Sequence, residues 1–248
     1  MKNLRIGVVG LGNIGKSLSS LITRNGYSET LRLGDKRRNI ETISNSDILF
    51  LTVRSNDLPD ILKQIEVVGS NDKLIVSFVT GISLDHLEET LDDYAVVRGS
   101  INIPVSIGKG TITYIPNENV NSQQLAHLQE ILKGPELLQV RNEKLIDIST
   151  VLIGCMPAFT SFIAEEYIHF GIKYGFTAEE AKKLYLSTLE GTACLLKEKC
   201  PEEVISLVTT KGGITYQGLS YLEQSGVREI LQDSLKSSLS GINLNKKD

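Results

Sequence analysis

The chain has 248 residues, which suits one large domain or two modest ones, and its 41% hydrophobic and 23% charged residues are ordinary for a globular protein. The formal net charge is −4 and no long block carries one sign, so nucleic-acid binding is not expected. No run approaches the length of a membrane span and no signal peptide precedes the first predicted strand, so we expect no membrane association. The three cysteines cannot all pair, which fits a reducing cytoplasm, and neither they nor the scattered histidines have metal-ligand spacing.

The first predicted elements are a strand, a glycine-rich turn and a helix. Residues 4–9 form a short apolar, β-branched run, and G-L-G-N-I-G follows at 10–15. Gly10 permits the tight turn, Gly12 has no side chain to keep the backbone away from a pyrophosphate, and Gly15 lets the helix pack close to the strand. The pattern predicts a dinucleotide site at the start of this helix; incidental glycines in an ordinary turn are the alternative.

The end of the next predicted strand bears on the choice of cofactor. Asp35 lies twenty residues beyond Gly15, where an acid would bind the ribose 2′-hydroxyl of NAD. Lys36, Arg37 and Arg38 follow at once, and cations there suit the 2′-phosphate of NADP. A solvated charged turn is the third interpretation. Because three adjacent cations outweigh one carboxylate, we favour NADP, with NAD possible.

The first half of the chain alternates strands with helices, which predicts a parallel, doubly wound sheet of the Rossmann-like α/β class. Ligands bind at the carboxyl ends of such strands, so residues 52–55 should approach the cofactor. Asn102 also follows a strand, where its amide would bond a nicotinamide or substrate, or alternatively its own turn. The predicted helices are 16–22, 39–46, 58–67, 84–91 and 123–132; the strands are 4–9, 30–38, 47–53, 73–79, 94–98 and 137–140.

From residue 143 onward the alternation stops and the chain is predicted to be all helical. A helix starting at Met156 is apolar around most of its circumference between residues 159 and 170, and we expect it to be buried. Further helices are expected near 177–196, 201–208 and 216–239, with a Gly-Gly loop at 209–215 as the candidate anion site or a plain turn. The apolar faces predict a partner chain, and we divide the chain into domains 1–145 and 146–248.

The order of these pieces resembles the pyrroline-5-carboxylate reductase family over nearly the whole chain. The resemblance implies an NAD(P)H domain followed by a helical dimerisation domain that interlocks with a second subunit, giving a homodimer or higher homo-oligomer in the cytoplasm. It also implies an oxidoreductase that reduces the C=N bond of 1-pyrroline-5-carboxylate to L-proline, the last step of proline biosynthesis. It is carried by Arg98…Asn102-Ile103-Pro104, Asp147…Gly154…Pro157-Ala158-Phe159, Glu165, Gly171…Gly175 and Val208-Thr209-Thr210…Gly212-Gly213-Ile214-Thr215…Gly218.

Carried over residue by residue, the resemblance implies two sets of contacts. Thr210, Gly213 and Thr215 would bind the substrate carboxylate, Lys211 would add attraction for it, and Thr215 would position substrate or relay a proton. A cyclic imine can arrive already protonated, so a strong general acid need not exist. The cofactor contacts would be Gly10, Leu11, Gly12, Asn13, Ile14, Asn39, Thr52, Val53, Arg54 and Asn102, with Lys36 and Arg37 from the charge argument.

This chain departs from the family pattern in the proposed pocket. Lys211 stands where the family has proline, Ile214 where it has a small residue, and Ile101 and Ile103 flank Asn102 where it has proline and threonine. These changes keep two alternatives open: a relative acting on another cyclic imine, and a nucleotide-binding paralogue without catalysis that serves in regulation. A 3-hydroxyacid dehydrogenase type would need a lysine in the first long helix, and residues 157–170 contain none.

Overall fold

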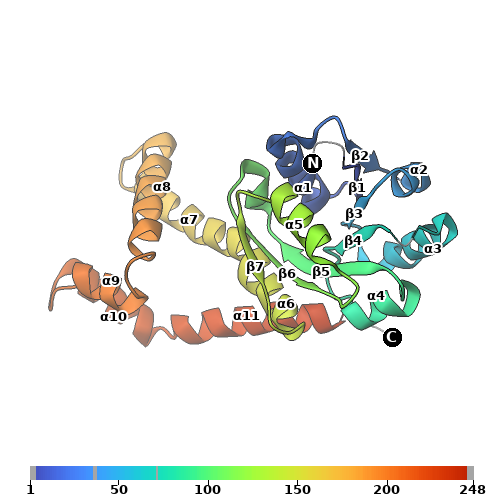
Figure 1. Ribbon diagram of the computed structural model, residues 1–248. Coiled ribbons are helices and arrows are strands. Elements are labelled where there is room, and N and C mark those ends of the chain that lie inside the picture. The colour runs from blue at the N-terminus through green and yellow to red at the C-terminus, as the bar shows by residue number, and fades with distance from the viewer. Residues whose placement is uncertain (1–3, 36–37, 71, 245–248) are drawn as a thin grey trace. The chain divides into compact units, whose positions relative to one another are not determined.

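The computed structural model describes residues 4–35, 38–70 and 72–244. They form two compact units: one contains the residues up to 157 together with those from 238 onward, and the other contains residues 158–237. The first unit holds the sheet, and the second is helical (Figure 1).

A seven-stranded, mostly parallel sheet forms the centre of the first unit. Its strand order is β2-β1-β3-β4-β5-β6-β7, in which β1 to β5 are parallel, β6 is antiparallel to β5, and β7 is parallel to β6. This confirms the predicted Rossmann-like fold class, but no strand was predicted at β6. The strands are β1 (Ile6–Val9), β2 (Leu31–Gly34), β3 (Ile48–Leu51), β4 (Leu74–Ser77), β5 (Ala95–Ile101), β6 (Thr111–Pro116) and β7 (Glu136–Gln139).

Helices cover both faces of this sheet (Figure 1). On one face, side chains such as Leu18 and Leu128 join a core with Phe50 and Phe78, whose rings stack with centroids 6.2 Å apart. That face carries α1 (Asn13–Ile22) and α5 (Ser122–Ile131). The opposite face carries α2 (Asn39–Ser44), α3 (Leu58–Val68) and α4 (Leu84–Thr90). Buried apolar side chains on both faces are what parallel strands require.

A continuous helix begins after the sheet and spans Lys144–Lys173. Its first part is α6 (Lys144–Ser149), which packs against β5 and β6, followed by a π-helical segment η4 (Thr150–Cys155) and α7 (Met156–Lys173). By length and composition this helix could cross a membrane, so the expectation that no run approaches a membrane span is wrong. The core helix of a globular protein passes the same test.

The second unit contains most of α7 and the helices that follow it, up to residue 237 within the last helix. These are α8 (Ala178–Leu195), α9 (Pro201–Val208), α10 (Ile214–Gln224) and α11 (Val227–Leu244). Thr177 and Glu180 form the predicted capping box at the start of α8. The single helix expected over 216–239 is wrong, because Gly226 has φ +69°, a conformation that glycine adopts without strain, and it separates α10 from α11.

The predicted burial of α7 does not occur within a single chain. Phe162, Tyr167 and Phe170 have 68%, 66% and 65% of their surfaces exposed. Between α7 and α8 the helices approach closely, since a Cβ on Gly171 would lie 2.9 Å from the Cβ of Ala181. An apolar groove of about 420 Å³ lies beside this contact, lined by Ile163, Tyr167, Phe170, Leu184, Tyr185 and Leu189 among others. Such a large exposed apolar surface is typical of an interaction site.

Candidate functional site

A cavity of about 600 Å³ opens at the carboxyl ends of β1, β2 and β3. The chain passes from β1 to β2 on one side and then returns to place β3 on the other side of β1. This reversal is the topological switch point at which open α/β sheets bind ligands. The lining includes Gly10, Leu11, Gly12, Gly34, Asp35, Asn39, Thr52, Val53, Arg54, Asp57, Asp60, Ile61 and Gln64.

The glycine-rich turn is held by a hydrogen bond from β3's end. Thr52 Oγ1 donates to the Gly10 carbonyl at 2.5 Å. Gly10 has φ +100°, and a Cβ on it would lie 2.6 Å from the backbone nitrogen of Val53. A Cβ on Gly15 would collide with the Gly10 carbonyl oxygen. Both glycines are therefore required by the turn itself, as the motif predicts.

Gly12 differs from these two glycines. Its φ of −69° is open to any residue, and a Cβ built on it meets no atom within 4 Å. Neither backbone strain nor packing within the described part of the chain accounts for the missing side chain. Gly12 is also the N-cap of α1, where no side chain caps the helix, and the first N–H groups of a helix have no partner within it. This arrangement suits a phosphate group. The predicted cofactor residues Asn13 and Ile14 begin this helix but do not line the cavity.

At the end of β2, Asp35 and Asn39 line the same cavity. Asp35 accepts a hydrogen bond from the Arg38 backbone at 3.2 Å and pairs with its guanidinium at 3.5 Å. Asn39 is 8% exposed, and its Oδ1 has no hydrogen-bond partner among the described residues. A buried acceptor without a donor is costly, and a ribose hydroxyl would supply one. The predicted cofactor residues Lys36 and Arg37 lie outside the described residues.

The cavity wall formed by Asp57 and the start of α3 was not predicted from the sequence. Asp57, Asp60, Ile61 and Gln64 line the cavity, and all lie in the first turns after β3 ends. The rule that selected residues 52–55 would have reached them had it been extended into the following helix.

Asn102, predicted as a cofactor residue, has a side chain engaged by the protein. Its Oδ1 accepts the Thr111 N–H at 3.0 Å, and its Nδ2 donates to the Ile153 carbonyl at 3.2 Å. The residue is 9% exposed.

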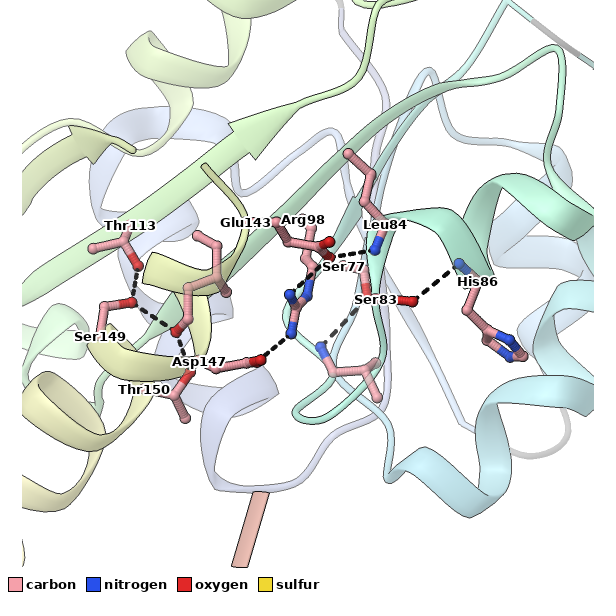
Figure 2. Close-up of polar contacts among 12 residues, drawn as sticks. Ser77, Ser83, Leu84, His86, Arg98, Thr113, Glu143, Asp147, Ser149 and Thr150 are labelled. Atoms are coloured by element: carbon pink, nitrogen blue, oxygen red, sulfur yellow. Dashed lines mark hydrogen bonds and ion pairs between the residues drawn. The ribbon is translucent and has the colours of Figure 1, made fainter. Parts of the chain in front are cut away.

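Arg98 forms a buried ionic cluster near Asn102 along β5. Its guanidinium donates to Glu143 at 2.7 Å and to Asp147 at 2.5 Å, and its side chain is only 3% exposed (Figure 2). Glu143 also accepts the Leu84 N–H, which connects α4 to the cluster. This cluster joins the sheet to α6, and its residues do not line the cavity.

The predicted substrate residues lie together in the second unit, in the loop between α9 and α10 and at the start of α10. Gly212 has φ +76°, and the Gly213 N–H donates to the Thr210 carbonyl at 2.9 Å. Gly213 is the N-cap of α10 without a side-chain cap, and Thr215 is the second residue of that helix. Lys211 is exposed. The loop thus joins hydroxyl groups, a cation and a helix N-terminus, a combination suited to a carboxylate.

Among the residues that the structure describes, no group of three or more His, Cys, Asp or Glu side chains is placed to hold a metal ion.

Known proteins resemble this chain both in its helical part and along nearly its whole length. Residues 143–242 match the family of pyrroline-5-carboxylate reductase dimerisation. The chain is 29% identical to the pyrroline-5-carboxylate reductase of Aquifex aeolicus over 94% of each chain. It is 30% identical to that of Synechocystis over 81% of this chain and 75% of the relative. The crystal structure of Plasmodium falciparum pyrroline carboxylate reductase with NADP bound superposes with a TM-score of 0.92 over 100% of both chains, at 26% identity. With a glycine-turn cavity in the first half and a dimerisation match in the second, the chain belongs to the pyrroline-5-carboxylate reductase family.

Proposed function

We propose that this protein reduces the C=N bond of 1-pyrroline-5-carboxylate to L-proline with NAD(P)H, the last step of proline biosynthesis. The observation that carries the proposal is the match to a pyrroline-5-carboxylate reductase along 94% of the chain, in a structure that also has the cavity at the glycine turn.

The cavity residues fit a nicotinamide dinucleotide. Gly12 and the N-terminus of α1 would hold the pyrophosphate, and the unpartnered Asn39 Oδ1 would accept a ribose hydroxyl. Thr52 keeps the turn in shape through Gly10, while Val53 and Arg54 border the same space. The cofactor supplies the hydride, and the protein supplies position and charge. We propose NADP as the preferred form, supported by the related structure with NADP bound.

The Gly-Gly loop would bind the substrate. Thr210 and Thr215 offer hydroxyl groups, Gly213 leaves backbone space, and the N–H groups at the start of α10 offer donors to a carboxylate. Lys211 adds a positive charge beside them. Thr215 would position the substrate or relay a proton, and a substrate that arrives protonated needs no strong acid from the chain.

The helical part would pair with a second copy. We place the boundary between a dinucleotide domain at 1–145 and a helical dimerisation domain at 146–248, supported by the family match at 143–242. A helix of the partner chain would cover the exposed apolar side chains of α7. This explains why the helix is long and apolar enough to span a membrane without requiring that it does so. We therefore propose a homodimer or higher homo-oligomer in the cytoplasm without membrane or nucleic-acid binding.

The test is the consumption of NADPH, and separately NADH, by the purified protein with 1-pyrroline-5-carboxylate as the acceptor. A larger cyclic imino acid and an imine without a carboxylate serve as comparison substrates. Turnover of the five-membered substrate with proline as the product is the expected result. Nucleotide binding with turnover of only another imine, or with no turnover, contradicts the proposal and favours the related imine reductase or the non-catalytic paralogue.

A further inference from the structure

Three polar attachments tie the sheet to the helix that follows it. Arg98 and Asn102 lie four residues apart at β5 and share one face of the sheet, because side chains alternate along a strand. Arg98 binds Asp147, and Asn102 donates to Ile153. Between them, Thr113 on β6 bonds Ser149 at 2.6 Å (Figure 2). The attachments therefore follow the helix from α6 into the π-helical segment η4.

The attachment at Ile153 coincides with a break in the helix's own hydrogen bonding. In an α-helix the carbonyl of residue 153 accepts the N–H of residue 157. Residue 157 is proline, which has no N–H. The π-helical segment η4 ends two residues before Pro157, as expected where the regular pattern is interrupted. Asn102 Nδ2 donates instead to the Ile153 carbonyl, which Pro157 leaves without an α-helical donor.

The other end of the Asn102 side chain fixes the turn into β6. Its Oδ1 accepts the Thr111 N–H, and Gly110, at φ +99°, leaves the space for that oxygen. Between these two points the chain forms the 3-10 helix η3 (Ile103–Ile107), which packs against α1. Val105 of η3 is fully buried in the same core as Leu18 of α1. Asn102 thus connects the helix break to the segment that supports the cofactor helix.

We propose that Asn102 is a positioning residue: its carboxamide compensates the helix break at Pro157 and holds η3 under α1, and it is not a side-chain ligand of the cofactor. The expected effect of Asn102 on turnover rests on the proposed function. The hydrogen-bond relationship itself is independent of the substrate.

The experiment is a double-mutant cycle with Asn102→Ala and Pro157→Ala in the full-length protein. Alanine at 157 supplies an N–H at the position from which an α-helix donates to the carbonyl of residue 153. In the wild-type background we expect Asn102→Ala to lower kcat/KM about tenfold, because small misplacements of reacting groups are costly, with the larger share in kcat. In the Pro157→Ala background the same change should lower kcat/KM less than about threefold, because the carbonyl no longer needs the carboxamide.

Asn117 provides the matched control. It is a buried carboxamide directly after β6. Its Oδ1 accepts the Val96 N–H and its Nδ2 donates to the Tyr94 carbonyl, and neither partner belongs to the long helix. Asn117→Ala should lower the thermal midpoint by the same amount in the wild-type and in the Pro157→Ala backgrounds. Asn102→Ala should lower it less with alanine at 157.

Two further readouts keep the inference separate from the proposed reaction. The thermal midpoints and the NADPH dissociation constant are measurable even if no imine is reduced. If Asn102→Ala weakens NADPH binding equally in both backgrounds and its thermal effect adds to that of Pro157→Ala, Asn102 is a direct ligand and the inference fails. Should Asn102→Ala not fold, Asn102→Asp keeps the acceptor for Thr111 and replaces the donor to Ile153 with a carboxylate oxygen, and the same cycle applies.

Discussion

The guanidinium of Arg98 donates to Asp147 at 2.5 Å across 49 residues of sequence, from a side chain that is 3% exposed. Glu143 binds the same guanidinium at 2.7 Å, so one buried cation serves two carboxylates (Figure 2). If one partner of a buried ion pair is removed, the charge that remains is poorly solvated and uncompensated.

Removing that cation should therefore destabilise the fold strongly. Arg98→Met leaves Glu143 and Asp147 without the guanidinium, and we expect the free energy of unfolding to fall by about 3 kcal/mol. The measurement is urea unfolding followed by circular dichroism. Arg5→Met is the control: Arg5 pairs with Asp47 but is 53% exposed, and it should lower the free energy by less than about 1 kcal/mol. Equal losses in the two variants would contradict the special role of burial.

The two glycines of the cofactor turn should respond differently to alanine. Gly12→Ala meets no atom of the described chain, so the thermal midpoint should stay within a degree or so while NADPH affinity falls by about tenfold or more. Gly10→Ala combines φ +100° with a clash against Val53, so it should lower the thermal midpoint as well. Calorimetric titration and thermal scans separate the two effects. Unchanged NADPH affinity in Gly12→Ala would remove Gly12 from the site.

Asp35 should influence the choice between the two nicotinamide cofactors. Its carboxylate lines the cavity and pairs with Arg38. Asp35→Ser removes a negative charge near the proposed 2′-position and releases Arg38 to bind a phosphate. We expect the ratio of kcat/KM for NADPH over NADH to rise about tenfold. Asp85→Ser, on α4 outside the cavity lining, should leave the ratio unchanged. A ratio that does not move in Asp35→Ser would place the 2′-position elsewhere.

The exposed apolar side chains of α7 should hold the assembly together. Phe162 is 68% exposed in the single chain, and a charge there would oppose burial against a second copy. Phe162→Glu should convert the proposed oligomer to monomer in analytical ultracentrifugation. Val67→Glu is the matched control, because Val67 on α3 is 83% exposed and lies in the first unit. An intact oligomer in Phe162→Glu would show that this face does not carry the interface.

The Arg5–Asp47 pair predicts one contribution to acid stability. The hydrogen bond from the Arg5 guanidinium holds the pKa of Asp47 below its ordinary value of 3.8. A lowered carboxylate pKa stabilises the fold fully above that ordinary value, and the stabilisation is lost as pH falls through the lowered pKa. Asp47→Asn should therefore be less stable than the wild type at neutral pH, by less than about 1 kcal/mol because solvent screens the pair. Urea unfolding over a pH series measures the difference, which should vanish in strong acid; a constant difference would contradict this explanation.

Much of the cofactor half could be predicted because its signals are local. A β-branched run, a glycine turn and a helical apolar stripe specify β1, Gly10, Gly15 and α1 within about twenty residues of chain. The carboxyl-end rule then selected Thr52, Val53 and Arg54, which do line the cavity with Gly10. The helical character of the second half follows from the same periodicity.

Only the tertiary structure decided which side chains are used by the protein itself. Asn102 bonds Ile153 51 residues away, and Arg98 bonds Asp147 49 residues away, and neither pairing has a local signature. Strand β6 runs antiparallel to β5, and its composition did not distinguish it from a loop. The exposure of α7 was mispredicted because periodicity reports that a face is apolar without stating which chain covers it. Local propensities thus determined the elements, while long-range pairing, whose partners lie far apart in the chain, determined the roles of Arg98 and Asn102.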